Sequence, residues 1–395
     1  MLNKTGRQVK DNLSSESVSQ TCADIKIRSI EAIPLRVPFK RPFKFSAGSL
    51  SEAEVLVVRM QTECGIVGVG ETQAWRRQGS NETLLKLVHA IKDIFAPLIV
   101  GRSPFELGAI MSSLEMALHH SLYAQAAVSD ALYDIQGKAL GVPVYQLLGG
   151  KSRDKLTLST VVPIRGGIAE TLDDVQRLYD EGFRTFLIKI GLDPKVDLAN
   201  VRAIREMLGD DVCLRVDANA SMSFDEALKL LKKLEPFDLD FAEQPISMWD
   251  LDGMAELSIR TSIPIMADES VSTDHDLINV IRYRAATGLQ TKQAKNGGLW
   301  RVQRLWAIAQ AAGMRIYPGN HPSLSIATAA VAHLATAWAG PIVDGVFSIG
   351  TGGEFVDDVV THPLRPVGNL MQVPEGPGLG VEIDEDRLAR LRIDI

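Results

Sequence analysis

The sequence predicts a two-part α/β protein, in which an α+β region precedes a closed barrel of alternating strands and helices. Three observations predict this fold. The first 150 residues show strand-like alternation and then helical spacing, and the residues after Lys155 alternate between the two patterns. Eight strand-like runs follow one another in this second part, which implies a parallel sheet with right-handed crossovers. Charged residues end five successive runs of that series.

The first region contains three strand-like segments followed by helical ones. IKIRSIEAIPLRV and EVLVVRM alternate in hydrophobicity, and a turn at residues 62–65 leads into IVGVGE, which predicts an antiparallel meander. From Glu82 to Leu140 the apolar residues recur with helical spacing. We therefore expect an α+β domain over residues 24–150, preceded by a mobile tail over the Ser-, Asn- and Lys-rich residues 1–23.

The second region predicts a barrel over residues 151–362. Its eight strand-like runs are separated by helical segments, and eight such units favour a closed (β/α)₈ barrel. An open doubly wound sheet is the alternative, but no G-x-G-x-x-G follows the first strand and no G-x-x-x-x-G-K-[ST] occurs. Gly65, Gly68 and Gly70 have the wrong spacing for a dinucleotide motif. Residues 363–395 leave the barrel pattern, and we expect them to pack back on the first domain. The predicted strands are residues 156–162, 183–190, 212–218, 239–244, 263–269, 288–294, 314–319 and 343–349.

Composition excludes several classes of partner. The chain has 395 residues, 46% of them hydrophobic and 23% charged, which is ordinary for a globular protein. A formal charge of −7 with scattered acidic residues argues against nucleic acid, which requires a basic face. The segment from Leu324 to Ala339 is too short and too mixed for a membrane span and predicts a buried helix. Three widely spaced cysteines, Cys22, Cys64 and Cys213, fit a reducing cytosol, so we expect a cytoplasmic protein.

Five ionisable residues stand at the ends of successive strand-like runs. They are Lys189 in FLIKIG, Asp217 in LRVDAN, Glu243 in FAEQP, Asp268 in IMADES and Lys292 in QTKQAKNGG, separated by 28, 26, 25 and 24 residues. These intervals are close to the length of one strand–helix repeat. Barrel enzymes carry their chemistry at the C-terminal ends of strands, so the spacing predicts a candidate active site there.

The three carboxylates of Asp217, Glu243 and Asp268 predict a divalent metal site. Hard oxygen ligands without nearby Cys or His favour Mg²⁺, with Mn²⁺ as the second candidate. Buried carboxylates are costly unless paired, so three that converge favour a bound cation. The alternative is that each one is bonded to local backbone. Asn219 and Glu269 are expected to support the ligands rather than to bind the metal.

Lys189 and Lys292 flank the carboxylates and are the candidate acid/base residues. A partly desolvated lysine beside a divalent cation has a lowered pKa and can act as a base. Two lysines on opposite faces of one substrate can remove a proton from one side and return it to the other, while a metal stabilises the enolate formed α to a carboxylate. The alternative is that they pair with the acids without chemistry. Lys295 is expected to point to the other face and to support the loop.

The end of the seventh predicted strand supplies another candidate. His321 in YPGNHPS is placed to contact or polarise a substrate, or to serve only as loop structure. The neighbouring Asn320 and Ser323 are further candidate substrate contacts.

The motifs FLIKIG, VDAN, EQP, ADES and KNGG resemble those of the enolase superfamily, and in particular its muconate lactonizing enzyme subgroup, from about Ile25 onward. The resemblance implies an α+β capping domain completed by the C-terminal tail and a modified (β/α)₇β barrel with an irregular last strand. It implies Mg²⁺ at Asp217, Glu243 and Asp268 and acid/base roles for Lys189 and Lys292. It also implies a homo-oligomer, either a dimer or an octamer, and a cap loop, KRPFKFSAGS, that places Phe45 and Ser46 near the substrate.

Two positions depart from the pattern of the subgroup. Leu187 replaces the first lysine of the K-x-K strand, so a charge that supports Lys189 is missing. Ser323 stands where many relatives carry an acidic residue.

The leading hypothesis is a Mg²⁺-dependent isomerase, either a cycloisomerase or a racemase/epimerase, that acts on a small carboxylate. The second is a lyase that uses the same enolate to expel a β-leaving group, as in dehydration of a hydroxy acid or hydroxyproline. The third is a barrel that binds a metal or ligand without turnover.

Overall fold

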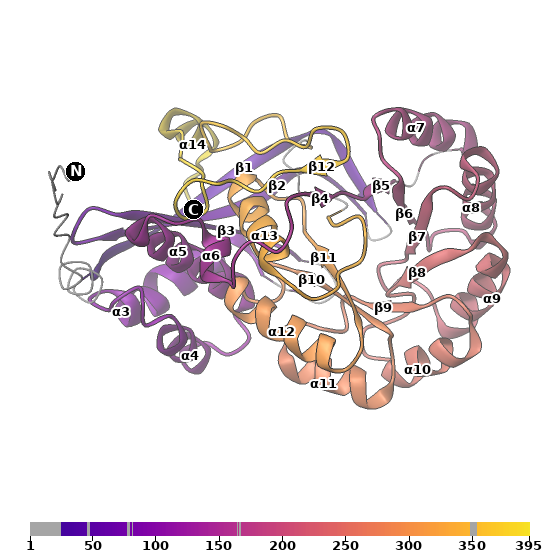
Figure 1. The fold of residues 1–395 in the computed structure, drawn as a ribbon, viewed down its shortest axis with the longest axis horizontal. Helices are drawn as coiled ribbons and strands as arrows, with labels where there is room; N and C mark the ends of the chain where they lie inside the picture. The colour runs from indigo at the N-terminus through magenta and orange to yellow at the C-terminus, as the bar shows by residue number, and fades with distance from the viewer. Residues whose placement is uncertain are drawn as a thin grey trace, which may run out of the picture.

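The computed structural model describes residues 25–45, 48–76, 80, 82–163, 165, 167–347 and 354–395. Its first part is a three-stranded antiparallel sheet in the order β1-β2-β3, covered by helices. We call this part the cap; it lies beside the barrel in Figure 1. The meander predicted from the sequence is confirmed, with the turn after Thr62 joining β2 to β3. The cap elements are β1 (Ile27–Phe45), β2 (Gly48–Thr62), β3 (Val67–Gln73), α2 (Leu84–His89), the π-helical segment η1 (Ala90–Phe95), α3 (Ala96–Ile99), α4 (Leu107–Ala117), α5 (Leu122–Leu140) and α6 (Val144–Leu147).

Two glycines let β3 lie directly on α5. A Cβ atom on Gly70 would stand 1.9 Å from the carbonyl oxygen of Ala127, and one on Gly68 would stand 2.5 Å from that of Ala131. No side chain fits at either distance. The glycine-rich IVGVGE segment therefore serves close packing of backbone on backbone rather than phosphate binding.

The second part is a parallel sheet of seven strands in the order β5 to β11, with helices between successive strands. In Figure 1 the helices form the outer layer around these strands. The barrel elements are β5 (Thr160–Val162), α7 (Ile168–Asp180), β6 (Thr185–Lys189), α8 (Pro194–Leu208), β7 (Cys213–Asp217), α9 (Phe224–Leu234), the 3₁₀ turn η2 (Glu235–Phe237), β8 (Leu239–Glu243), α10 (Leu251–Arg260), β9 (Ile265–Ala267), α11 (Asp274–Tyr283), β10 (Gly288–Lys292), α12 (Leu299–Ala311), β11 (Arg315–Gly319) and α13 (Ser325–Ala337).

A short irregular segment closes the barrel in place of an eighth strand. The Val343 and Phe347 amides donate to carbonyls of β11, at Ile316 and Pro318, both at 2.9 Å. On its other side the segment forms a single parallel bridge, from Val346 to Leu158. The irregular last strand that the resemblance implied is confirmed.

The first predicted barrel strand, residues 156–162, is wrong as one continuous element. It divides into β4 (Leu156–Thr157) and β5, because β4 turns to pair antiparallel with β12 (Leu370–Met371). The pattern of apolar residues runs through the division, so periodicity alone gave no sign of it. The predicted buried helix is confirmed, since every residue of α13 is buried.

The C-terminal segment returns to the cap. Arg392 forms an antiparallel bridge with Leu35 of β1, and the Ile393 amide donates to the Pro34 carbonyl at 3.0 Å. The helix α14 (Glu385–Leu391) adds an ion pair between Glu385 and Arg59 at 2.8 Å. Figure 1 shows α14 beside β1, so the two ends of the described chain build the cap together.

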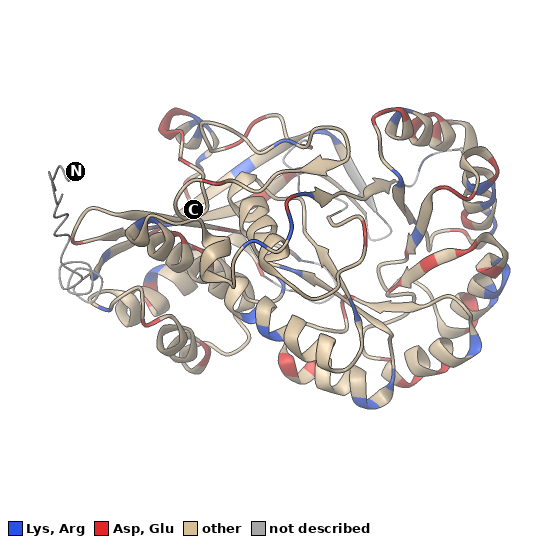
Figure 2. Ribbon diagram, viewed as in Figure 1, with Lys and Arg blue, Asp and Glu red and all other residues tan. Residues whose placement is uncertain are grey.

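Charged residues are mixed over the outer helices. In Figure 2 Lys and Arg alternate with Asp and Glu along α7 to α11 rather than gathering on one side of the view. Within the described residues, no helix combines the length and the apolar character that crossing a bilayer requires.

Candidate active site

Strand register brings the ionisable residues together at the C-terminal edge of the barrel sheet. Lys189, the last residue of β6, is paired with Asp217 of β7, and Asp217 is in turn paired with Glu243 of β8. Asp268 follows the last residue of β9, and Lys292 ends β10. All five side chains are nearly or fully buried, which the spacing of the sequence motifs alone did not require.

Each flanking lysine is paired with one carboxylate. Lys189 Nζ donates to Asp217 Oδ2 and, at 3.0 Å, to Asn219 Oδ1. Lys292 Nζ donates to Asp268 Oδ2. The two amines thus pair with different carboxylates of the group, and their acid/base roles stay a prediction.

The electrostatics of these lysines are set by burial and by their carboxylate partners. Burial lowers the pKa of Lys189, but Asp217 and Glu243 outweigh it, and the pKa is raised. Burial also opposes the charge of Lys292, and Asp268 again outweighs it, so this pKa is raised well above its usual range. These raised pKa values belong to amines that donate to carboxylates, and the lowered lysine pKa that we expected beside a bound cation stays a prediction.

Glu243 lies between the two ion pairs, and none of the described cationic side chains forms an ion pair with it. Its pKa is raised well above the usual value by burial first and then by the charges of Asp217 and Asp268. Its Oε2 has no hydrogen-bond partner among the described residues. With its amide turned to donate, Gln290 reaches Glu243 Oε1 at 2.5 Å and Asp268 Oδ2 at 3.0 Å. A buried carboxylate oxygen without a partner is rare and marks a place for a ligand.

These residues fit a divalent cation in their chemistry. The donor set consists of carboxylate oxygens, the ligands that Mg²⁺ and Mn²⁺ prefer, and it includes the unpartnered Glu243 Oε2. Within the described part of the chain, no three side chains of His, Cys, Asp or Glu stand close enough together to hold one metal ion. The ammonium groups of the two flanking lysines form ion pairs with Asp217 and Asp268. They supply positive charge beside the carboxylates.

Asn219 contacts Asp217 directly and Glu269 contacts Asn219, while their supporting role toward a metal stays a prediction. The Asn219 backbone amide donates to Asp217 Oδ1 at 2.8 Å, and its Nδ2 donates to Asp217 Oδ2 at 3.1 Å and to Glu269 Oε1 at 3.3 Å. Burial, followed by the charge of Asp268, raises the pKa of Glu269 to about 8. Asn219 therefore fixes the orientation of Asp217 through both of its oxygens.

Lys295 contradicts the sequence-based expectation that it would point away. Its Nζ donates to Asp268 Oδ1 at 2.7 Å and also to the Asp268 carbonyl, and the side chain is 4% exposed. Strand alternation does not apply, because β10 ends at Lys292 and the chain then turns. Asp268 consequently binds two ammonium groups, which lower its pKa strongly in spite of burial.

Two glutamines of the site were missed by the sequence reasoning. Gln290 lies two residues before Lys292 in β10, so alternation along this strand could have placed it on the same inward face. Gln244 accepts hydrogen bonds from the Asp268 and Ser270 amides at 3.1 and 3.0 Å, and so ties the end of β8 to that of β9. No periodicity signals this second contact, because Gln244 has left the strand.

The replacement at Leu187 places an apolar side chain inside the barrel. Leu187 is 1% exposed and packs with Phe241, Met266, Tyr317 and Val343. The support that Lys189 does receive comes from Asn219 instead.

The loop after β11 carries three candidate residues, Asn320, His321 and Ser323. Ser323 Oγ donates to Asn320 Oδ1 at 3.2 Å and to the His321 carbonyl at 3.0 Å, and Asn320 Oδ1 also accepts from the His321 amide. These bonds shape the loop itself. The imidazole of His321 is 4% exposed, and its Nδ1 has no partner within the described ranges.

Two aromatic residues of the cap cover His321. Its ring centroid lies 4.8 Å from that of Trp75 and 5.9 Å from that of Tyr123. Burial, followed by the charge of Lys292, lowers the pKa of His321 well below its usual value, so the imidazole is neutral. Phe45 ends β1, and Ser46 lies outside the described residues. Their substrate contacts, like those of Asn320, His321 and Ser323, stay predictions.

Carboxylates of the cap hold two barrel helices in place. Glu71 of β3 accepts from the Leu324 and Ala327 amides, at 2.7 and 2.9 Å, at the N-terminus of α13. Asp130 of α5 accepts from the Leu299 amide at 3.0 Å, at the N-terminus of α12. A carboxylate at a helix N-terminus satisfies free amides and complements the helix dipole. The cap is thereby fixed to the elements that follow Lys292 and His321.

Comparison with known proteins shows the family that both parts of the chain are similar to. Residues 29–149 match the model of the mandelate racemase / muconate lactonizing enzyme N-terminal domain, and residues 170–387 match the enolase C-terminal domain-like model. Muconate cycloisomerase 1 of Rhodococcus opacus is 34% identical over 92% of this chain and 97% of the relative. N-succinyl-L-Arg/Lys racemase of Bacillus cereus is 30% identical over 93% of this chain and 98% of the relative. L-Ala-D/L-Glu epimerase of Clostridium acetobutylicum is 32% identical over 90% and 98%.

Solved structures show the same fold. The crystal structure of N-succinyl Arg/Lys racemase from Bacillus cereus superposes with a TM-score of 0.89 at 29% identity, over 93% of this chain and 98% of the other. The muconate lactonizing enzyme from Pseudomonas fluorescens, complexed with muconolactone, gives a TM-score of 0.89 at 33% identity, over 93% and 99%. Members of the matched family typically depend on a divalent metal ion. The resemblance inferred from the motifs is confirmed, and the chain belongs to the mandelate racemase/muconate lactonizing enzyme family of the enolase superfamily.

Proposed function

We propose that the protein is a divalent-metal-dependent isomerase, a cycloisomerase or racemase/epimerase, that moves the proton α to the carboxylate of a small substrate. The observation that carries the proposal is the flanking of Glu243 by two lysine–carboxylate pairs, Lys189 with Asp217 and Lys292 with Asp268. Relatives that carry out racemisation, epimerisation and cycloisomerisation support the same reaction class.

Asp217, Glu243 and Asp268 would hold the metal, Mg²⁺ or Mn²⁺. When bound, the cation would stabilise the negative charge that develops as the substrate loses its α-proton. Asn219 keeps the Asp217 carboxylate oriented, Lys295 binds the Asp268 carboxylate, and Gln244 accepts from the Asp268 backbone amide, so the residues around the ligands fix their positions.

Lys189 and Lys292 would carry the proton. One lysine, in its neutral form, takes the α-proton onto Nζ, and the other, as an ammonium, returns a proton to the opposite face of the same carbon. A racemase or epimerase then alternates the two roles between the two directions of reaction. The neutral His321 and the aromatic rings of Trp75 and Tyr123 cover the site and limit the access of water.

Proton exchange in D₂O tests the proposal. The Mg²⁺-loaded protein is incubated in D₂O with N-acyl amino acids, dipeptides, proline betaines and muconates, and deuterium at the α-carbon or in the product is measured by NMR and mass spectrometry. Deuterium in recovered substrate together with inverted configuration indicates a racemase or epimerase, and a lactone indicates a cycloisomerase. A keto product would instead assign the protein to the lyases and overturn the isomerase proposal.

Alanine variants test the catalytic role of each lysine separately. Lys189→Ala and Lys292→Ala are each expected to lower the rate of isomerisation by about 10³-fold, the scale of general acid–base catalysis. Lys233→Ala, which removes an exposed lysine from α9, is the matched control and should keep the rate of the parent. Full turnover by Lys189→Ala would remove the base assignment.

A further inference from the structure

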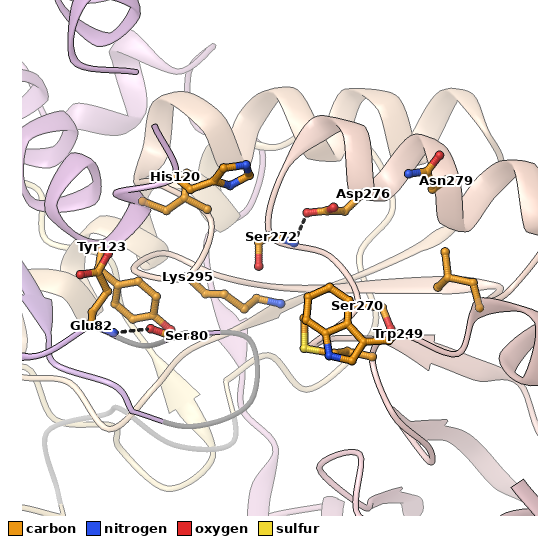
Figure 3. Close-up of a pocket in the computed structure, with 13 residues that line it drawn as sticks. Ser80, Glu82, His120, Tyr123, Trp249, Ser270, Ser272, Asp276, Asn279 and Lys295 are labelled. Atoms are coloured by element: carbon orange, nitrogen blue, oxygen red, sulfur yellow. Dashed lines mark hydrogen bonds between the residues drawn. The ribbon is translucent and has the colours of Figure 1, made fainter. Parts of the chain in front are cut away.

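The turn that follows β10, residues 293–298, holds Lys292 at the boundary between cap and barrel. Figure 3 shows part of this boundary, with Tyr123 of the cap at the left, Ser270 of the barrel at the right and Lys295 of the turn between them. Because Lys292 is the last residue of its strand, the position of its side chain depends on what fixes this turn.

Asn296 fixes the turn on its barrel side. The Oδ1 of this residue accepts from the Lys292 amide at 2.8 Å, and its Nδ2 donates to the carbonyls of Val271 and Ser272 at 3.0 and 3.1 Å. The side chain is fully buried. The backbone of Lys292 is thereby tied to the loop that follows Asp268.

Gln293, the residue next to Lys292, fixes the turn on its cap side. Its Nε2 donates to Asp130 Oδ2 at 2.6 Å and to the Glu71 carbonyl oxygen at 3.0 Å, and its side chain is 2% exposed. Both partners are acceptors, so only the Nε2 end of the amide fits between them. Gln293 therefore joins the backbone of Lys292 to two elements of the cap, β3 and α5.

Asp130 holds the start of the turn and the helix after it. Its Oδ2 accepts from Gln293, and its Oδ1 accepts from the Leu299 amide at 3.0 Å, at the start of α12. Gly298, which closes the turn, packs against the same cap helix, since a Cβ atom there would stand 2.6 Å from the Cβ of Ser129. A fully buried carboxylate cannot move away from either donor without leaving a buried polar group unpaired.

Lys189 is supported differently. Among the described residues, its Nζ donates to Asp217 and Asn219, which both belong to the barrel. The loop after Lys189 is also held by a barrel residue, because the Gly191 amide donates to Asp197 Oδ2 at 2.8 Å. The contacts of α5 therefore bear on one of the two lysines and not on the other.

We propose that Asp130 is a positioning residue of the isomerisation, which holds Lys292 in place opposite Lys189 through the side chain of Gln293. The cap then contributes to proton transfer on one face of the substrate in addition to covering the site. This inference rests on the proposed function, since it concerns the lysine that exchanges a proton on that face.

Two aspartates of α5 supply a matched pair of variants. Asp130→Asn keeps an acceptor for the Leu299 amide, but it turns an NH₂ group toward the NH₂ group of Gln293 and so breaks that bond. Asp134→Asn removes an equally buried carboxylate of the same helix, whose partners lie in the cap and the C-terminal segment. Gln293→Met removes the bond from the other side and replaces Asp130→Asn if that variant does not fold.

The first measurement follows the two lysines without a substrate. Lysine labelled with ¹³C at Cε gives resolved ¹H–¹³C signals, and Lys189→Ala and Lys292→Ala identify those of the site. Spectra are recorded with Mg²⁺ at pH 8.5, because burial raises the pKa of Asp130 to about 7 and both of its oxygens are then acceptors. We expect Asp130→Asn and Gln293→Met to shift the signal of Lys292 and to leave that of Lys189 in place.

The second measurement follows α-proton exchange of the D and L forms of N-acetylalanine in D₂O by NMR. Each enantiomer presents its α-proton to one lysine, and loss of exchange in Lys292→Ala identifies the enantiomer that faces Lys292. Asp130→Asn should slow exchange of that enantiomer by about 10²-fold, the effect of a misplacement of about 1 Å, and leave the other close to the parent rate. A general loss of structure would slow both enantiomers alike.

The outcomes separate this inference from the proposed function. An unmoved Lys292 signal in Asp130→Asn and Gln293→Met, the same shift in Asp134→Asn, or equal slowing of the two enantiomers would overturn the positioning role and leave the isomerase proposal standing. A shifted Lys292 signal in a protein that exchanges neither enantiomer would support the positioning of the amine and count against the isomerase.

Discussion

The Glu71 carboxylate in the cap accepts a 2.7 Å hydrogen bond from the backbone amide of Leu324, at the start of a barrel helix. The loop that carries His321 leads directly into this helix, so a cap residue fixes the position of a candidate active-site loop. One buried carboxylate thus joins two parts of the chain that lie more than 250 residues apart in sequence.

Glu71 makes the stability of the protein depend on pH. Burial raises its pKa to about 8, against the opposing effect of the Ala327 and Leu324 amides, whereas the ordinary value is 4.5. Between these two values the folded state binds more protons than the unfolded state, so the free energy of unfolding falls as pH rises through this range. Urea unfolding of the parent and of Glu71→Gln at pH 5, 6.5 and 8 should show a steeper fall for the parent. An equal fall in both would contradict this role; Glu52→Gln, exposed on β2, is the control.

Gly70 is a second determinant of the joint between β3 and α5. A methyl group at this position would stand 1.9 Å from the Ala127 carbonyl oxygen, and the backbone on both sides would have to move. We expect Gly70→Ala to lower the free energy of unfolding by about 3 kcal/mol, the upper range for overpacking. Gly167→Ala is the control, because a methyl group there would meet nothing within 4 Å. Equal unfolding midpoints of the two variants in urea would show that the strand can shift at little cost.

Arg215 holds the barrel interior together from within. Its side chain is 1% exposed and bonds to Asp240 at 2.9 Å and to the Gly345 carbonyl at 2.8 Å, with the guanidinium 4.8 Å from the Phe241 ring centre. Gly345 belongs to the irregular closing segment, so removal of the guanidinium releases the barrel closure and takes one of two arginine partners from the half-buried Asp240, which keeps Arg315. Arg215→Ala should lower the free energy of unfolding by about 3 kcal/mol, the upper range for hydrogen bonds to a charged group. Arg282→Ala, exposed on α11, should leave thermal and urea unfolding close to those of the parent.

We expect Glu243 to lower the stability of the metal-free protein and to contribute to metal binding. The neighbouring acids and burial disfavour its charge, so Glu243→Gln should raise the melting temperature measured in EDTA. In Mg²⁺ the parent should gain stability, because a ligand that binds only the folded state stabilises it, and the variant should gain little. Differential scanning calorimetry with and without Mg²⁺ measures both effects, with Glu256→Gln as the control. A variant that melts lower in EDTA, or that keeps the full Mg²⁺-dependent gain, would contradict the placing of Glu243 among the metal ligands.

Much of the fold could be predicted because its strands are short apolar runs separated by amphipathic helices. The register that brings Lys189, Asp217 and Glu243 together follows from strand ends that share one edge of a parallel sheet. Contacts made outside regular elements could not be predicted in this way. Lys295 points back to Asp268 because the chain turns after β10, and β4 separates from β5 because it pairs with a segment more than 200 residues away.

The parts of the site that the cap contributes also could not be predicted from the sequence. Trp75 and Tyr123 cover His321 from two cap segments that no local pattern relates to the seventh barrel strand. The cavity lined by Tyr123 of the cap and Lys295 of the barrel likewise depends on how the cap sits on the barrel. Spacing predicted which residues are charged and where their strands end, whereas the shape of the space above them required the tertiary structure.

The bridge between Leu35 and Arg392 has a consequence for biosynthesis. The ribosome synthesises β1 early, but the segment that completes its edge emerges only after the whole barrel has been translated. During that interval the nascent sheet presents an unpaired edge, the kind of surface that chaperones bind and that promotes aggregation. The cap is therefore completed only after the barrel has been synthesised.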